Sequence, residues 1–121
     1  MIKQSATHVQ HMQKALDQMN VRLHNVISDI TGTTGLKILR AIIHGERDPQ
    51  KLAYYRDRRC KSSQAVIEKS LIGNYRPEHV FALKQALELY DFYRTKIEEC
   101  DLEIEGLLRE LVTDVEKNYT K

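Results

Sequence analysis

The chain has 121 residues, a formal net charge of +2, 41% hydrophobic residues, 30% charged residues and no tryptophan. Its modest apolar content favours an elongated shape, and its five glycines and two prolines argue against an architecture of strands and tight turns. No run of about 18 uncharged apolar residues is present, and residues 1–10 lack the basic-then-apolar layout of a signal peptide. We therefore expect an all-α, cytoplasmic protein with no membrane span.

The small net charge hides an uneven distribution along the chain. Residues 36–61 carry eight basic and three acidic side chains, a balance of +5, whereas residues 78–121 carry six and eleven, a balance of −5. A basic middle beside an acidic tail indicates a local surface for a polyanion. A solvated helix face of mixed charge explains the same numbers equally well.

The first expected element is a long helix over residues 1–31. Its apolar residues advance by alternating steps of three and four, and the positions between them are largely polar. This heptad seam is typical of a coiled coil, so the helix needs a partner helix. The seam residues are Val9, Met12, Leu16, Met19, Leu23, Val26 and Ile30.

A small head of short helices is expected over residues 36–76. Asp48 followed by Pro49 is typical of a helix N-cap with proline in the first turn, and this helix is expected to run through Tyr55. Ser62 or Ser63 can cap the next helix, over residues 64–72. The glycines expected to end helices in the head are Gly45 and Gly73.

A second long helix is expected over residues 77–118, with no glycine or proline between Pro77 and Gly106. At about 1.5 Å per residue it spans roughly 60 Å, and a helix with so narrow an apolar stripe is not stable alone in water. We therefore expect an antiparallel coiled-coil stalk with the first helix, and self-association as a homodimer. The expected oligomer interface consists of Leu83, Tyr90, Tyr93, Ile97, Cys100, Ile104, Leu107 and Leu111, with Leu87, Leu108 and Val115 widening the stripe.

No pattern of catalytic or metal-binding residues stands out. Cys60 and Cys100 lie far apart without Cys-x-x-Cys spacing, which indicates free thiols. Asp101, Glu103 and Glu105 fan around one helix, so a solvated flank is favoured over a metal site. Because nucleophile and phosphate-loop motifs are also missing, we expect no catalytic residue, no metal and no cofactor.

Residues 30–36 join two helices through a turn with two glycines and leave backbone N–H groups at the start of the next helix. Such groups can hold a phosphate. The turn is similar to helix-hairpin-helix elements but lacks their Gly-apolar-Gly core. The predicted nucleic-acid-binding residues are Gly32, Gly35, Lys37, Arg40, Arg56, Arg58, Arg59, Lys61 and Arg76.

Four stretches carry a resemblance to a known family: residues 19–32 with the following Gly35 and Leu36, residues 45–49, residues 76–79 and residues 86–93. Together they resemble the middle region of bacterial insertion-sequence transposases of the DEDD class, the recombinases guided by a bridge RNA. The resemblance extends over nearly the whole chain. It implies a helical, coiled-coil insert that helps to assemble subunits around DNA and guide RNA during transposition.

The family's catalytic parts have no counterpart in this sequence. The resemblance implies an N-terminal domain with four metal-binding acids and a C-terminal domain with a serine nucleophile, and it carries neither over to any residue here. Two other functions stay open. The chain could be a free-standing helical adaptor that binds only protein, or a nucleic-acid-binding module whose basic head acts without a dimer.

Overall fold

The computed structural model describes the backbone of residues 2–119 and the side chains of residues 6–117. These residues form helices and no strand, so the all-α prediction is confirmed. The elements are α1 (Ile2–Gln18), the 3-10 turn η1 (Leu23–Asn25), α2 (Thr33–Ile43), α3 (Pro49–Ala53), α4 (Gln64–Ser70) and α5 (Pro77–Tyr119). No helix within the described residues is long and apolar enough to cross a membrane.

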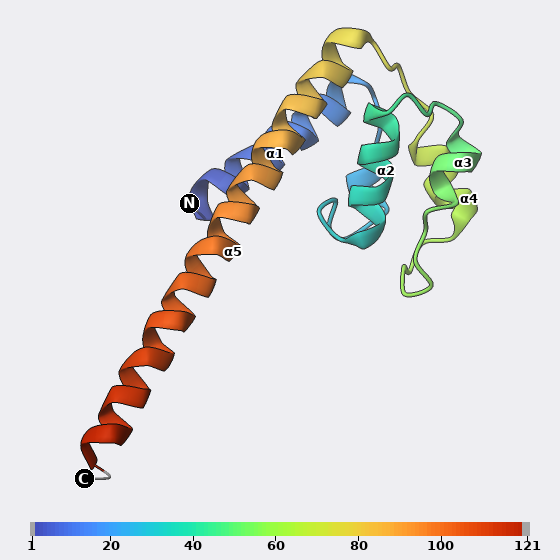
Figure 1. Cartoon of the computed structure of the whole chain (residues 1–121). Helices are drawn as coiled ribbons and strands as arrows, with labels where there is room; N and C mark the ends of the chain where they lie inside the picture. Colours follow the sequence, from blue (N-terminus) through green and yellow to red (C-terminus); the bar gives the residue numbers. More distant parts are fainter. Residues whose placement is uncertain (1, 120–121) are drawn as a thin grey trace.

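The molecule consists of a long rod with a cluster of short helices at one end (Figure 1). The rod is α5, and its 43 residues span roughly 65 Å. The expectation of a long C-terminal helix is therefore confirmed. Helices α2, α3 and α4 lie to one side of the first turns of α5, while α1 lies beside the first half of the rod.

Helix α1 ends at Gln18, so the expectation of a helix over residues 1–31 is wrong. Asn20 has a positive φ of 58°, and its N–H donates to the carbonyl of Asp17 at 2.9 Å. The N–H of Val21 donates to the carbonyl of Leu16, also at 2.9 Å. These two bonds form a Schellman motif, in which a left-handed residue ends a helix and turns the chain away. The head therefore begins at residue 19 and consists of residues 19–76.

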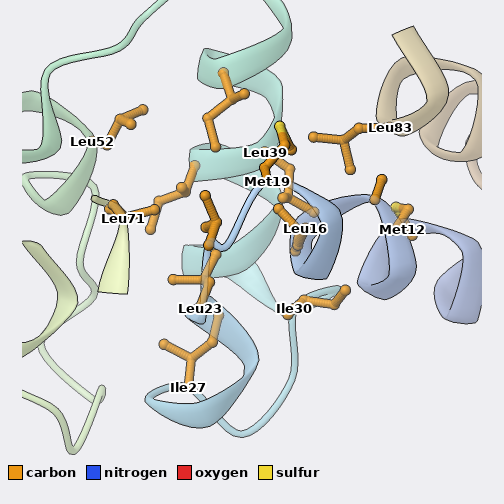
Figure 2. Packing of buried hydrophobic residues seen from close by; sticks show 14 of the residues in the cluster. Met12, Leu16, Met19, Leu23, Ile27, Ile30, Leu39, Leu52, Leu71 and Leu83 are labelled. Atoms are coloured by element: carbon orange, nitrogen blue, oxygen red, sulfur yellow. The ribbon is translucent and has the colours of Figure 1, made fainter. Parts of the chain in front are cut away.

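Val9 and Val26 of the predicted first seam are partly buried, and Met12, Leu16, Met19, Leu23 and Ile30 are buried. Figure 2 shows them converging with side chains of the other helices in one hydrophobic core. The periodicity continues past the break at Asn20 because the residues on both sides of it enter the same core. The fully or almost fully buried members include Met12, Leu16, Met19, Leu23 and Ile30 from the seam, Leu39, Leu52 and Leu83 from other helices, and Leu71 just after α4.

The N-cap predictions and the role of Gly45 are confirmed, but the prediction for Gly73 is wrong. Helix α4 ends at Ser70 with Leu71 as its C-cap, and Gly73 instead packs closely on the backbone, because a Cβ atom there would lie 2.4 Å from the carbonyl oxygen of Met19. The carboxylate of Asp48 accepts a hydrogen bond from the N–H of Gln50 at 3.0 Å, and the hydroxyl of Ser63 accepts one from the N–H of Val66 at 3.3 Å. Gly45 has a φ of +110° just after the end of α2, where glycine is favoured. Helix α2 begins three residues earlier than expected, and α3 and α4 each end two residues earlier.

Helix α1 runs along α5 in the opposite direction. His8 of α1 stacks on Tyr93 with ring centroids 5.3 Å apart, whereas Gln18 near the end of α1 lines the same groove as Ala82. The paired length is set by the 17 residues of α1. Beyond the level at which α1 starts, no other element of the described residues lies beside α5 (Figure 1).

Candidate functional site

The turn before α2 lies next to residues 56–61, which follow α3 and which we call the basic loop, although the two segments are far apart in the sequence. A groove of about 580 Å³ runs between them. The hydroxyl of Thr34 accepts a hydrogen bond from the N–H of Asp57 at 3.0 Å, and the hydroxyl of Ser62 donates to the carbonyl of Val26. The groove is lined by His24, Asn25, Val26, Ile27, Ser28, Asp29, Gly32, Thr33, Thr34, Asp57, Arg59, Cys60 and Lys61.

The N-terminus of α2 forms one wall of this groove. Gly32 is its N-cap, with extended backbone angles and no side-chain hydrogen bond to the first turn. The first N–H groups of a helix have no partner within the helix and can face a negatively charged group. The predicted position of Gly32 beside a polyanion surface is therefore compatible with the fold.

Gly35 has a different role from the predicted one. It is buried, and a Cβ atom placed there would lie 2.2 Å from the carbonyl oxygen of Ile30. Only glycine lets the first turn of α2 pack so closely on the preceding backbone. Glycine at position 35 is therefore explained by packing, and its burial separates it from the predicted phosphate contacts.

Four of the predicted basic residues lie on one loop, and three of them, Arg58, Arg59 and Lys61, have exposed side chains. Arg59 and Lys61 line the groove, and Arg58 lies between Asp57 and Arg59 with an exposed side chain. Asp29 and Asp57 also line the groove, so its two basic and two acidic side chains give a formal charge of zero. The excess positive charge that is exposed in this region therefore comes from Arg58, which lies on the loop and does not line the groove.

Asp57 stays ionised in this setting. The backbone N–H of Arg59 donates to its carboxylate at 3.0 Å, and this bond holds the pKa of Asp57 below its usual range. The guanidinium of Arg59 and the ammonium of Lys37 lower the pKa further. The ion pair with Asp57, 3.4 Å long, uses part of the charge of Arg59, although this side chain is 88% exposed.

Two predicted phosphate contacts, Arg40 and Arg56, have guanidinium groups that are already hydrogen-bonded inside the molecule. Arg40 of α2 donates twice to Asp91 of α5, at 2.7 and 2.9 Å, and this hydrogen bonding raises the pKa of Arg40. Arg56 donates to the carbonyls of Ser62 and Cys60 and so closes the basic loop on itself. The first pair fixes α2 against α5, and the second shapes the loop.

The remaining predicted basic residues, Lys37 and Arg76, do not line the groove. Lys37 is exposed on α2 and lines a neighbouring groove together with His44 and Tyr55. Arg76 directly precedes α5, and the start of α5 lies at the opposite end of the head from the basic loop (Figure 1). The nine predicted residues therefore do not form one surface.

The predicted oligomer interface is divided by the fold. Leu83 is fully buried and so is not accessible to a second chain as we expected, and Tyr90 is partly buried against the same core. Tyr93 stacks on His8, and Ile97 is partly buried. The accessible members are Cys100 and, with 55%, 57% and 60% exposure, Ile104, Leu107 and Leu111.

These accessible residues lie in residues 98–117 of α5, which we call the tail. Leu108, Val112 and Val115 are 45–56% exposed there and widen the apolar stripe. Sequence reasoning missed Val112 as an interface residue, although its position beside Leu111 and Leu108 on the helix surface could have indicated it. It also missed the wall formed by residues 24–29, because it placed them in a helix.

Within the described residues, no three His, Cys, Asp or Glu side chains are placed to hold a metal ion. Cys60 is partly buried and Cys100 exposed, and both thiols are free. No family model, curated protein or solved structure matches this chain. Its own two surfaces and the resemblance of its sequence are therefore the basis of any functional proposal.

Proposed function

We propose that the chain is the helical assembly region of a bridge-RNA-guided insertion-sequence transposase of the DEDD class. In this role it joins two copies through the tail and holds DNA or guide RNA beside the basic loop of the head. The four resembling stretches, residues 19–32, 45–49, 76–79 and 86–93, support the transposase origin. The proposal assigns no catalytic residue to this chain.

The observation that carries the proposal is the bare apolar stripe of the tail. Six apolar side chains on one side of a single helix are about half exposed, and nothing in the described chain covers them. A patch of this kind on a water-exposed helix marks an interaction site, because single helices gain most of their stability by packing. The six residues are Ile104, Leu107, Leu108, Leu111, Val112 and Val115.

Sedimentation over a range of concentrations tests the self-association. We expect the unchanged chain to form a dimer and Ile104→Glu to shift it to the monomer. Leu102→Glu is the matched control, because Leu102 is 68% exposed but points away from the stripe, about 200° around the helix from Ile104. A chain that stays monomeric at tens of micromolar would refute the proposal, and equal effects of both variants would place the interface elsewhere.

The nucleic-acid part of the proposal depends on Arg58, Arg59 and Lys61. Their exposed side chains project from one loop next to the N-terminus of α2, a combination suited to phosphate groups. Because phosphate contacts do not read bases, we expect weak binding to structured RNA or duplex DNA, with little sequence preference and a steep decrease as salt rises.

Charge reversal separates this role from a purely structural one. We expect changing Arg58, Arg59 and Lys61 to Glu to abolish binding at low salt while helicity and sedimentation stay unchanged. The matched control changes Lys14, Lys69 and Lys84, which are exposed and do not line the groove, to Glu. If both triple variants bind equally well, the basic loop is not the binding site, and if the unchanged chain does not bind at all, the chain acts as an adaptor that binds only protein.

A further inference from the structure

The apolar stripe of the tail lies on the same face of α5 as the residues that α1 covers. Tyr90, Ile97, Ile104 and Leu111 follow one another at intervals of seven residues, and such positions drift by only about 20° per heptad around a helix. Tyr90 packs against the core, whereas Ile104 and Leu111 are 55% and 60% exposed. Whatever covers the tail therefore lies on the same side of α5 as α1.

The start of α1 limits where a partner can bind. His8 stacks on Tyr93, and α1 begins six residues before His8, at Ile2. Because α1 and α5 run in opposite directions with the same rise per residue, α1 reaches roughly the level of residue 99 of α5. Residues 100–117 then provide a bare stripe of about 27 Å.

We propose that a second copy of the chain covers this stripe, and that the two tails pair antiparallel over residues 100–117. In this pair Ile104 lies beside Val115 of the second copy, and Leu108 lies beside Leu111 of the second copy. The inference rests on the self-association proposed above and specifies its geometry. The two-fold axis passes between Arg109 and Glu110, so the two heads lie at opposite ends of a continuous helical rod.

The position of α1 excludes the parallel alternative. Packed helices lie about 8–10 Å apart, so two parallel tails in contact leave no space between the two α5 helices. Each α1 occupies the face of α5 that would turn toward the partner, and two of them would have to fit into that space. In the antiparallel pair, each tail ends where α1 of the other copy begins.

The spacing of the stripe fits a second copy of the same sequence. Ile104, Leu108, Leu111 and Val115 are separated by four, three and four residues, an order that is the same when it is read backwards. A two-fold interface needs such self-complementarity, because each side supplies both halves of every contact. The tail carries eight acidic and two basic side chains, so salt should strengthen the pairing by screening repulsion between the copies.

Disulfide crosslinking tests the orientation. In the antiparallel pair, Leu107 faces Asp114 of the second copy along one edge of the stripe, and both side chains are exposed in the single chain. Chains freed of native thiols by Cys60→Ser and Cys100→Ser would carry either Leu107→Cys or Asp114→Cys. After mild oxidation, we expect a covalent dimer in the mixture of the two variants and no covalent dimer in either variant alone.

Each other outcome contradicts a specific part of the inference. A covalent dimer of Asp114→Cys alone would show a parallel pair and overturn the orientation. A dimer in sedimentation that gives no crosslink in any combination would overturn the proposed register. Adding Ile104→Glu to the mixture should remove the crosslink, and its persistence would show that the stripe is not the interface. A chain that stays monomeric at every salt concentration would refute self-association itself and leave the tail to a partner of different sequence.

Discussion

The two halves of α5 have the same apolar pattern, but the apolar side chains are buried in one half and exposed in the other. In the half beside α1, Leu83 and Ala86 are 0% and 4% exposed, whereas Ile104 and Leu111 in the tail are 55% and 60% exposed. Both pairs belong to one seam that advances in steps of three and four. The periodicity therefore predicts which residues form an apolar stripe, but it does not predict which element covers that stripe.

Charge also distinguishes the two halves. Residues 77–97 carry three acidic and three basic side chains, whereas the tail carries eight acidic and two basic ones. The half with equal numbers of acidic and basic side chains is covered by α1, whereas the apolar stripe of the strongly acidic tail is exposed. The excess of acidic side chains makes every contact between two tails repulsive, so only a contact that buries enough apolar surface can outweigh it.

The largest expected difference between the halves concerns stability. Leu83→Ala removes a fully buried side chain and should lower the free energy of unfolding by about 2–5 kcal/mol. Leu111→Ala should change it by less than about 0.5 kcal/mol in the monomer, since this side chain is 60% exposed. Urea denaturation at a concentration below that of self-association measures both. Equal losses would mean that the tail is covered within the chain.

Two glycines sharpen the same comparison. Gly35→Ala places a Cβ atom 2.2 Å from the carbonyl oxygen of Ile30 and should destabilise the chain by about 1–3 kcal/mol. Gly106→Ala meets no atom within 4 Å and should stabilise α5 by about 0.5–1 kcal/mol, because alanine is the better helix former. Thermal unfolding followed by circular dichroism checks both signs. Destabilisation by Gly106→Ala would reveal a close contact at that face of the tail.

The smallest expected effects come from the ion pairs. Removing the pair between Arg40 and Asp91, whose side chains are 44% and 42% exposed, should cost about 0.5–1 kcal/mol. The pair between Arg109 and Glu105 within the tail should contribute only about 0.3–0.5 kcal/mol. Double-mutant cycles with alanine at both members isolate each coupling. A larger coupling in the tail would contradict the assignment of Arg40 as the anchor of α2.

Local signals in the sequence predicted much of the fold. Asp48, Ser63 and Gly45 cap their helices as expected, and Pro77 opens the long helix. The end of α1 was missed because the apolar spacing continues across it. Asn20 was the available signal, since asparagine tolerates the left-handed conformation that ends a helix.

The candidate site was harder to predict, because the use of each arginine depends on distant partners. Arg40 meets Asp91, which lies 51 residues away in the sequence. Arg56 is used by backbone carbonyls, which no residue pattern records. Only Arg58, Arg59 and Lys61 remain available on one loop, so a balance of +5 in the sequence overstates the charge that the head can offer to a polyanion.

The length of α5 also sets an angle between the two surfaces. Every residue of an α-helix adds about 1.5 Å of distance and about 100° of rotation. An insertion of seven residues between Ile97 and Ile104 would move the tail about 10 Å farther from the head and leave its stripe close to its present direction. A deletion of two residues there would turn the stripe by about 200°, to the side opposite α1. The number of residues in the uninterrupted helix therefore fixes both the distance of the apolar stripe from the head and the direction in which the stripe faces.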